Sequence, residues 1–132
     1  MSTKKHQIYE IDVEIYACKV WLAIDVPSAV INDLYETDKD VIDKLVNNSS
    51  NDAFAVATVI TKPDKRRGIL LWFEDIKAYR PHILAHEAAH AVFDIFTEVG
   101  IPVSYDNQEA FCYCLDFIIK KLTEAKHLSR TY

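Results

Sequence analysis

Two histidines and a glutamate stand at a spacing that suits metal-dependent chemistry, in the run HEAAH from His86 to His90. On a helix, residues four apart lie on one face, so His86 and His90 can direct imidazole nitrogens at one cation. Glu87 would stand beside the metal rather than on it, where a carboxylate can take a proton from water. The pattern therefore predicts a two-histidine zinc half-site with Glu87 as general base.

A third ligand is needed, because a catalytic zinc normally has three protein ligands and one open position for water. Glu109 stands 19 positions after His90, at the start of an expected helix that can pack back against the helix of HEAAH. We therefore expect Glu109 to complete a site for one zinc ion per chain. The alternative is a capping box, Asp106-x-x-Glu109, in which the carboxylate accepts a hydrogen bond from a backbone N–H.

The alternative for the histidine pair is a place in an ordinary core, where hydrogen bonds satisfy both rings. HEAAH falls in the middle of an otherwise apolar helical stretch. Burying two histidines and a glutamate there without partners would cost free energy, and a metal site accounts for all three residues together. We therefore favour metal binding.

The elements that position these residues follow from the spacing of apolar positions. The expected strands span 8–15, 16–24, 53–60 and 69–73, and the expected helices span about 28–46, 81–99 and 106–128. The stretch 16–24 is either a second strand or the first strand continued past a bulge. The basic loop Thr61–Gly68 joins the last two strands, so an antiparallel hairpin is expected.

This order predicts one α+β domain that spans residues 1–132, with a small, mainly antiparallel sheet packed on about three helices. HEAAH is expected on the central helix, between Pro81 and Gly100, which mark its start and end.

HEAAH followed at this distance by Glu109 resembles the gluzincin branch of the zinc metallopeptidases, such as the thermolysin-like enzymes, whose third ligand is a glutamate on the next helix. The chain is also similar to small zincin-like proteins of bacteriophages and prophages, through ILLWFE, HEAAH and the run Asn107-Gln108-Glu109-Ala110. The resemblance covers about Ile69 to Ile119. It implies a minimal zincin-like domain in which His86, His90 and Glu109 bind zinc and Glu87 is the base.

The same resemblance implies that Ile69 to Glu74 is an edge strand, along which a peptide or protein substrate lies as an added strand. The chain departs from the thermolysin-like pattern at Tyr113, where those enzymes have an aspartate that orients a histidine. Asp94 and Asp116 are the candidates for that role here. The group that stabilises the oxyanion is not specified by the pattern, and the candidates are Tyr79, Tyr105 and Tyr113.

Composition and charge narrow the choice of binding partners and of cellular compartment. The net charge is −5 and the basic residues are scattered except for Lys62–Arg67, so no nucleic-acid partner is expected. No apolar run approaches the length of a membrane span, and the N-terminus lacks the apolar segment of a signal peptide. Cys18, Cys112 and Cys114 are odd in number and form no CxxC, which agrees with free thiols in the cytoplasm.

The expected function is therefore that of a cytoplasmic zinc-dependent metallopeptidase. The alternative is a zincin-like domain that binds zinc or a protein partner without turnover, its metal serving stability. A purely structural site needs no base beside the metal, so the presence of Glu87 favours the enzyme.

Overall fold

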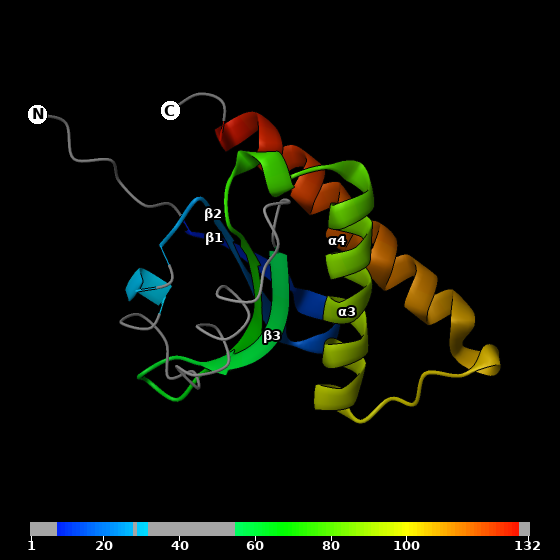
Figure 1. Ribbon diagram of the computed structural model, residues 1–132. Coiled ribbons are helices and arrows are strands. Elements are labelled where there is room, and N and C mark those ends of the chain that lie inside the picture. Colours follow the sequence, from blue (N-terminus) through cyan, green and yellow to red (C-terminus); the bar gives the residue numbers. More distant parts are fainter. Residues whose placement is uncertain (1–7, 28, 32–54, 130–132) are drawn as a thin grey trace, which may run out of the picture.

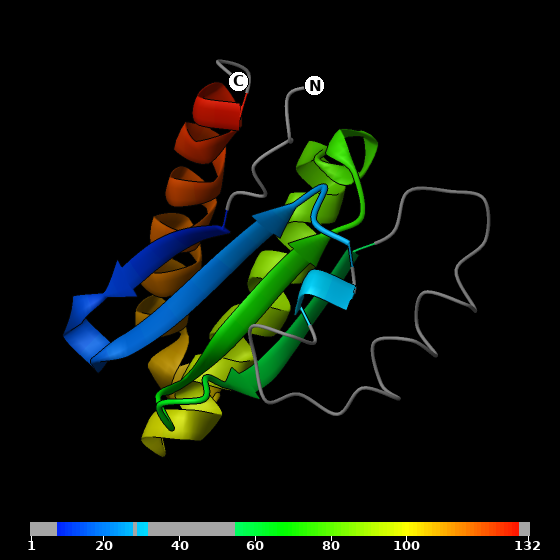
Figure 2. The same ribbon diagram turned by 90° about the vertical axis from the view of Figure 1, so that its left-hand side faces the viewer.

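A computed structural model describes residues 8–27, 29–31 and 55–129 of the chain. They form an α+β domain in which a sheet of four strands carries two long helices on one face (Figure 1 and Figure 2). The strands are β1 (Ile8–Val13), β2 (Cys18–Ile24), β3 (Ala55–Thr61) and β4 (Arg67–Phe73), and the helices are α3 (Pro81–Val99) and α4 (Gln108–Ser129). The predicted α+β class is confirmed. The predicted helix 28–46 lies outside the described residues, apart from a helical stretch at 29–31.

The sheet has the strand order β1-β2-β4-β3. The hairpins β1–β2 and β3–β4 are antiparallel, and β2 pairs with β4 in parallel, so the sheet is mixed although mainly antiparallel. The predicted hairpin around Thr61–Gly68 is confirmed. Of the two alternatives for 16–24, the structure shows a second strand and not a continuation of the first. The short 3-10 turn η1 (Glu14–Tyr16) and Ala17, whose φ is 50°, separate β1 from β2.

The expectation that Ile69–Glu74 is an edge strand is wrong. This stretch belongs mostly to β4, which pairs with β2 on one side and with β3 on the other. The reason is visible in its side chains, since every residue of β4 after Arg67 is buried and a strand that is apolar on both faces suits the middle of a sheet. Among the described strands, β1 and β3 form the edges.

The two central strands approach each other closely at Gly68. A Cβ atom at this position would lie 2.6 Å from the backbone oxygen of Lys19 and 2.6 Å from the ring of Trp21. Glycine is therefore required for the indole of β2 to lie against β4.

Apolar residues fill both faces of the sheet. On the helix face, strand residues such as Val20, Leu22, Ile69 and Leu71 pack with the inner stripes of α3 and α4. On the other face, a second cluster gathers around Trp21 and Trp72 and includes Val26 and Ile31 from the segment after β2. The indole N–H of Trp72 donates a hydrogen bond of 2.6 Å to the backbone oxygen of Val26.

The helix of HEAAH has the bounds that its sequence signals predict. Pro81 occupies the first turn, where its missing N–H is not needed. Gly100 ends the helix with a φ of 77°, and the N–H of Ile101 donates to the oxygen of Phe96 at 2.8 Å, as in a Schellman motif. The helix thus continues for nine residues beyond His90.

Within the residues that the structure describes, no helix is both long and apolar enough to cross a membrane.

Candidate metal centre

His86 and His90 lie side by side on the exposed face of α3. Their Nε2 atoms are 3.2 Å apart, and their ring centroids are 4.8 Å apart with the ring planes at 73°. Two nitrogens that each lie about 2.05 Å from a tetrahedral zinc ion would be about 3.3 Å apart. The spacing of the two Nε2 atoms therefore fits a shared zinc ion, and it equally allows a hydrogen bond between the two rings when one Nε2 carries a proton.

The neighbours of α3 define which side of the helix carries the site. The helix packs over β3 and β4, and α4 runs beside it on the same face of the sheet (Figure 2). Phe93 and Phe96 meet Phe111 of α4, with ring centroids 5.0 and 5.9 Å apart. Helical spacing puts Glu87 and Asp94, seven residues apart, on the opposite flank of α3, away from α4.

The side chain of Glu87 points from α3 toward the core of the protein, whereas His86 and His90 are exposed. Its exposed fraction is 7%, and it is the only buried charged residue among those described. Burial raises the pKa of its carboxyl group, and the nearby His86 and His90 act in the opposite direction. No described residue forms a hydrogen bond or ion pair with this carboxylate. The Glu87 carboxylate thus lies close enough to the histidine pair for their charges to act on its pKa.

Asp94 occupies the next turn of the same flank, four residues after His90. It is half-buried, and its pKa is raised by burial, lowered by the charge of His90 and raised by Glu98. Helical spacing puts Asp94 one turn after His90, and no described hydrogen bond joins the two side chains. Asp116, the other candidate for orienting a histidine, is exposed on α4.

Glu109 is not brought to the histidines. No group of three or more His, Cys, Asp or Glu side chains with metal-binding geometry occurs among the described residues. Nine residues of α3 after His90 extend the helix by about 13.5 Å. The start of α4 lies beside this C-terminal half, because Phe111 packs on Phe93 and Phe96. Glu109 therefore lies along α3 beyond the turns that carry His86 and His90.

The capping box proposed as the alternative role for Glu109 is not formed either. Glu109 is exposed in the first turn of α4, and no described hydrogen bond joins its carboxylate to the backbone of Asp106. The turn before α4, η3 (Tyr105–Asn107), is instead held by the side-chain amide of Asn107, which donates to the oxygen of Pro102 at 3.0 Å.

The three tyrosines considered for the oxyanion lie in different surroundings. Tyr79 is buried and its hydroxyl donates a hydrogen bond to the backbone oxygen of Leu122, so it supports α4 and is not available to a substrate. Burial raises its pKa well above the ordinary value. Tyr105 is 83% exposed, and Tyr113 is 71% exposed on α4, beside a cavity between α4 and β1. None of the three stands in a described contact with His86 or His90.

An ion pair that anchors α3 was not expected from the sequence. Arg67, at the start of β4, donates two hydrogen bonds to the carboxylate of Glu98, at 2.7 and 3.0 Å. The pair joins the last turn of α3 to the sheet and so helps to fix the helix that carries HEAAH. The two residues are 31 positions apart in the sequence. At this separation, the sequence alone does not indicate which oppositely charged residues form an ion pair.

Comparison with known proteins adds no relative: the chain matches no protein-family model, no curated protein and no solved structure.

Proposed function

We propose that this protein is a zinc-dependent metallopeptidase, with His86 and His90 as metal ligands and Glu87 as general base. The observation that carries the proposal is the 3.2 Å separation of the two Nε2 atoms, which equals within about 0.1 Å the separation expected at a tetrahedral zinc. The buried carboxylate of Glu87 on the adjoining turn adds the group that hydrolysis needs.

The chain's own residues would divide the work as follows. His86 and His90 would hold the metal through their Nε2 atoms. A bound zinc supplies Lewis acidity, which makes water a better nucleophile and polarises the peptide carbonyl. Glu87 accepts the proton from water at its carboxylate and passes it to the leaving amine. Half-buried Asp94, one turn after His90 on the same helix, would attract the imidazole of His90 when that ring is positively charged.

A second candidate function is a zinc-binding domain without turnover. It is favoured by the position of Glu109, since the described residues supply two ligands at the site rather than three. Two histidines bind zinc more weakly than a three-residue set, and a metal so held can stabilise the fold or bridge to a partner without hydrolysing a peptide.

Metal analysis of the untagged protein tests the proposal. We expect about one zinc per chain, and we expect His86→Ala and His90→Ala each to abolish stoichiometric binding. His82→Ala is the matched control, because His82 is exposed one turn earlier on the same helix and should leave the zinc content unchanged. Absence of zinc from the wild-type protein, even after zinc is added, would rule out both candidate functions.

Peptidase activity separates the two candidates. Hydrolysis of a library of quenched fluorescent peptides should require zinc and should disappear in Glu87→Gln, while the zinc content of this variant stays near that of the wild type. Zinc binding without any hydrolysis would favour the domain without turnover.

We also propose that the protein is cytoplasmic. The support is that Cys18, Cys112 and Cys114 are all free thiols, although Cys18 and Cys114 both lie buried in the same core cluster. Mass spectrometry after alkylation of freshly lysed cells should find all three thiols reduced.

A further inference from the structure

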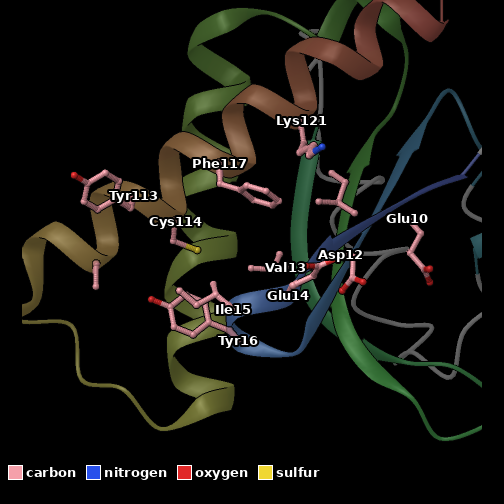
Figure 3. A pocket seen from close by; sticks show the side chains of 12 residues that line it. Glu10, Asp12, Val13, Glu14, Ile15, Tyr16, Tyr113, Cys114, Phe117 and Lys121 are labelled. Carbon is pink, nitrogen blue, oxygen red and sulfur yellow. The ribbon is translucent and has the colours of Figure 1, made fainter.

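A groove of about 900 Å³ lies between β1 and α4 (Figure 3), and we call it the β1 groove. Its far wall is the edge of the sheet, because within the described part of the chain β1 pairs only with β2. Alternate backbone N–H and C=O groups of such an edge strand point away from the sheet and can pair with another strand. The groove therefore combines a hydrogen-bonding edge with a cavity beside it.

The walls of the β1 groove are largely apolar on the helix side of the sheet. Val13 is buried at its base, and Cys114 and Phe117 face it from α4 (Figure 3). Ile15 and Tyr113 line the same groove and are 84% and 71% exposed. Two large apolar side chains left in water around one cavity are typical of a surface that another polypeptide covers.

The strand that borders the groove is acidic. Glu10, Asp12 and Glu14 line the cavity, and among the described residues Lys121 is the only basic one that does. Lys121 lies 3.7 Å from Glu124, so its charge is already partly balanced.

Glu10 and Asp12 belong to the other face of the sheet from buried Ile11 and Val13, since side chains alternate along a strand. Both carboxylates reach Lys19, at 3.7 and 3.2 Å, yet their side chains stay 43% and 49% exposed. Glu10 also accepts a hydrogen bond of 3.0 Å from the indole N–H of Trp21, so Asp12 is the carboxylate with more capacity left for an approaching cation.

We propose that the β1 groove binds an extended peptide segment in which apolar and basic residues alternate, added to β1 as a further strand. The apolar side chains of such a segment enter the cavity against Phe117 and Tyr113. Its basic side chains fall on the opposite face, beside Glu10 and Asp12, where opposite charges on neighbouring strands attract. Apolar and acidic side chains alternate along β1, so a partner strand should alternate between apolar and basic side chains.

A second copy of this chain is a poorer occupant. Pairing of two β1 strands would bring the acidic residues Glu10, Asp12 and Glu14 of one copy beside those of the other, and like charges on neighbouring strands repel. The β1 groove is also separate from the metal centre, because α3 lies over β3 and β4, on the other half of the sheet.

Fluorescence anisotropy with labelled synthetic peptides of about ten residues tests the proposal. A peptide of alternating valine and lysine should bind saturably to the full chain, and a peptide of alternating valine and glutamate should not. Methylation of the backbone nitrogens along one edge of the valine–lysine peptide should abolish binding, because it removes the hydrogen bonds to β1. Equal binding of the methylated peptide would overturn the added-strand geometry.

Two substitutions locate the binding. Asp12→Lys should weaken binding of the valine–lysine peptide about tenfold, and Glu74→Lys is the control with the same change of charge at an exposed site after β4. Tyr113→Ser, at an exposed position that folding does not depend on, should weaken binding about threefold. His86→Ala should bind the peptide as the wild type does, whatever the fate of the metal.

The proposal fails if the valine–lysine peptide does not bind, or if Asp12→Lys and Tyr113→Ser both bind it unchanged. Sedimentation of the wild-type protein as a dimer that Tyr113→Ser converts to a monomer would assign the groove to a second copy instead.

Discussion

Replacing Glu87 with glutamine should stabilise the metal-free protein while removing its proposed activity. The carboxylate is 7% exposed, and no described residue donates a hydrogen bond to it. A buried polar group left without a partner costs about 1–3 kcal/mol, and an ionised group costs more than a neutral one. Glutamine has nearly the same shape without the charge. At pH 8 we therefore expect Glu87→Gln to raise the free energy of unfolding by about 1–2 kcal/mol.

The sign of the pH dependence follows from the same burial. The pKa of Glu87 is raised in the folded protein, so the folded state holds its proton to higher pH than the unfolded chain does. The protonated Glu87 therefore contributes to the free energy of unfolding of the wild type below the ordinary carboxyl pKa of 4.5. This stabilising contribution is lost as the pH rises through the folded-state pKa. The advantage of Glu87→Gln should be largest at pH 8 and should shrink toward pH 4.

Urea unfolding in the presence of EDTA measures this difference, with the fluorescence of buried Trp21 and Trp72 as the signal. Glu74→Gln is the control, because it removes an exposed carboxylate and should change the free energy of unfolding by less than about 0.5 kcal/mol. A variant Glu87→Gln that is less stable than the wild type at pH 8, or whose advantage is the same at pH 4 and pH 8, would refute the reasoning.

Three further substitutions test the site and the fold. Glu109→Ala should change the zinc dissociation constant by less than about twofold, because the structure places this carboxylate away from the histidines; a loss of 100-fold or more in a zinc titration would restore the third-ligand role that the sequence pattern predicts. Gly68→Ala should cost about 2–3 kcal/mol, since its Cβ would lie 2.6 Å from backbone, and wild-type stability in urea unfolding would contradict the close packing of β4 against Trp21. Gly100→Ala should cost about 1 kcal/mol, because a side chain is strained at a φ of 77°, and thermal unfolding should show a midpoint lower by a few degrees.

Much of the fold could be predicted from local signals. Pro81 and Gly100 bracket α3 at the residues where it begins and ends, because a proline in the first turn and a glycine in the left-handed conformation act on the backbone locally. The alternation of apolar and acidic residues over 8–15 likewise predicts a strand with one exposed face, and β1 occupies Ile8–Val13 of this stretch. The place of β4 was missed, because an apolar strand pairs with whichever neighbours the chain brings beside it.

The part of the candidate site that lies within one helix was also predictable. His86 and His90 meet because residues four apart on a helix share a face, and this holds in any tertiary context that keeps α3 helical. Glu87 turns inward for the same local reason, since its position three residues from buried Leu84 and one from buried Ala88 puts it on the core side of α3.

Apart from the β3–β4 hairpin, the contacts that join one element to another required the tertiary structure. The spacing of Glu109 from HEAAH counts residues along the chain, whereas a ligand must be close in space, and the length of α3 beyond His90 together with the packing of Phe111 carries Glu109 past the histidines. The β1 groove depends likewise on how α4 lies against the sheet edge. The sequence by itself determined the histidine pair, the inward glutamate and the bounds of their helix, because these follow from backbone geometry within a few residues. The packing of the helices on the sheet decided which residues of other elements lie near the histidine pair and where the β1 groove forms.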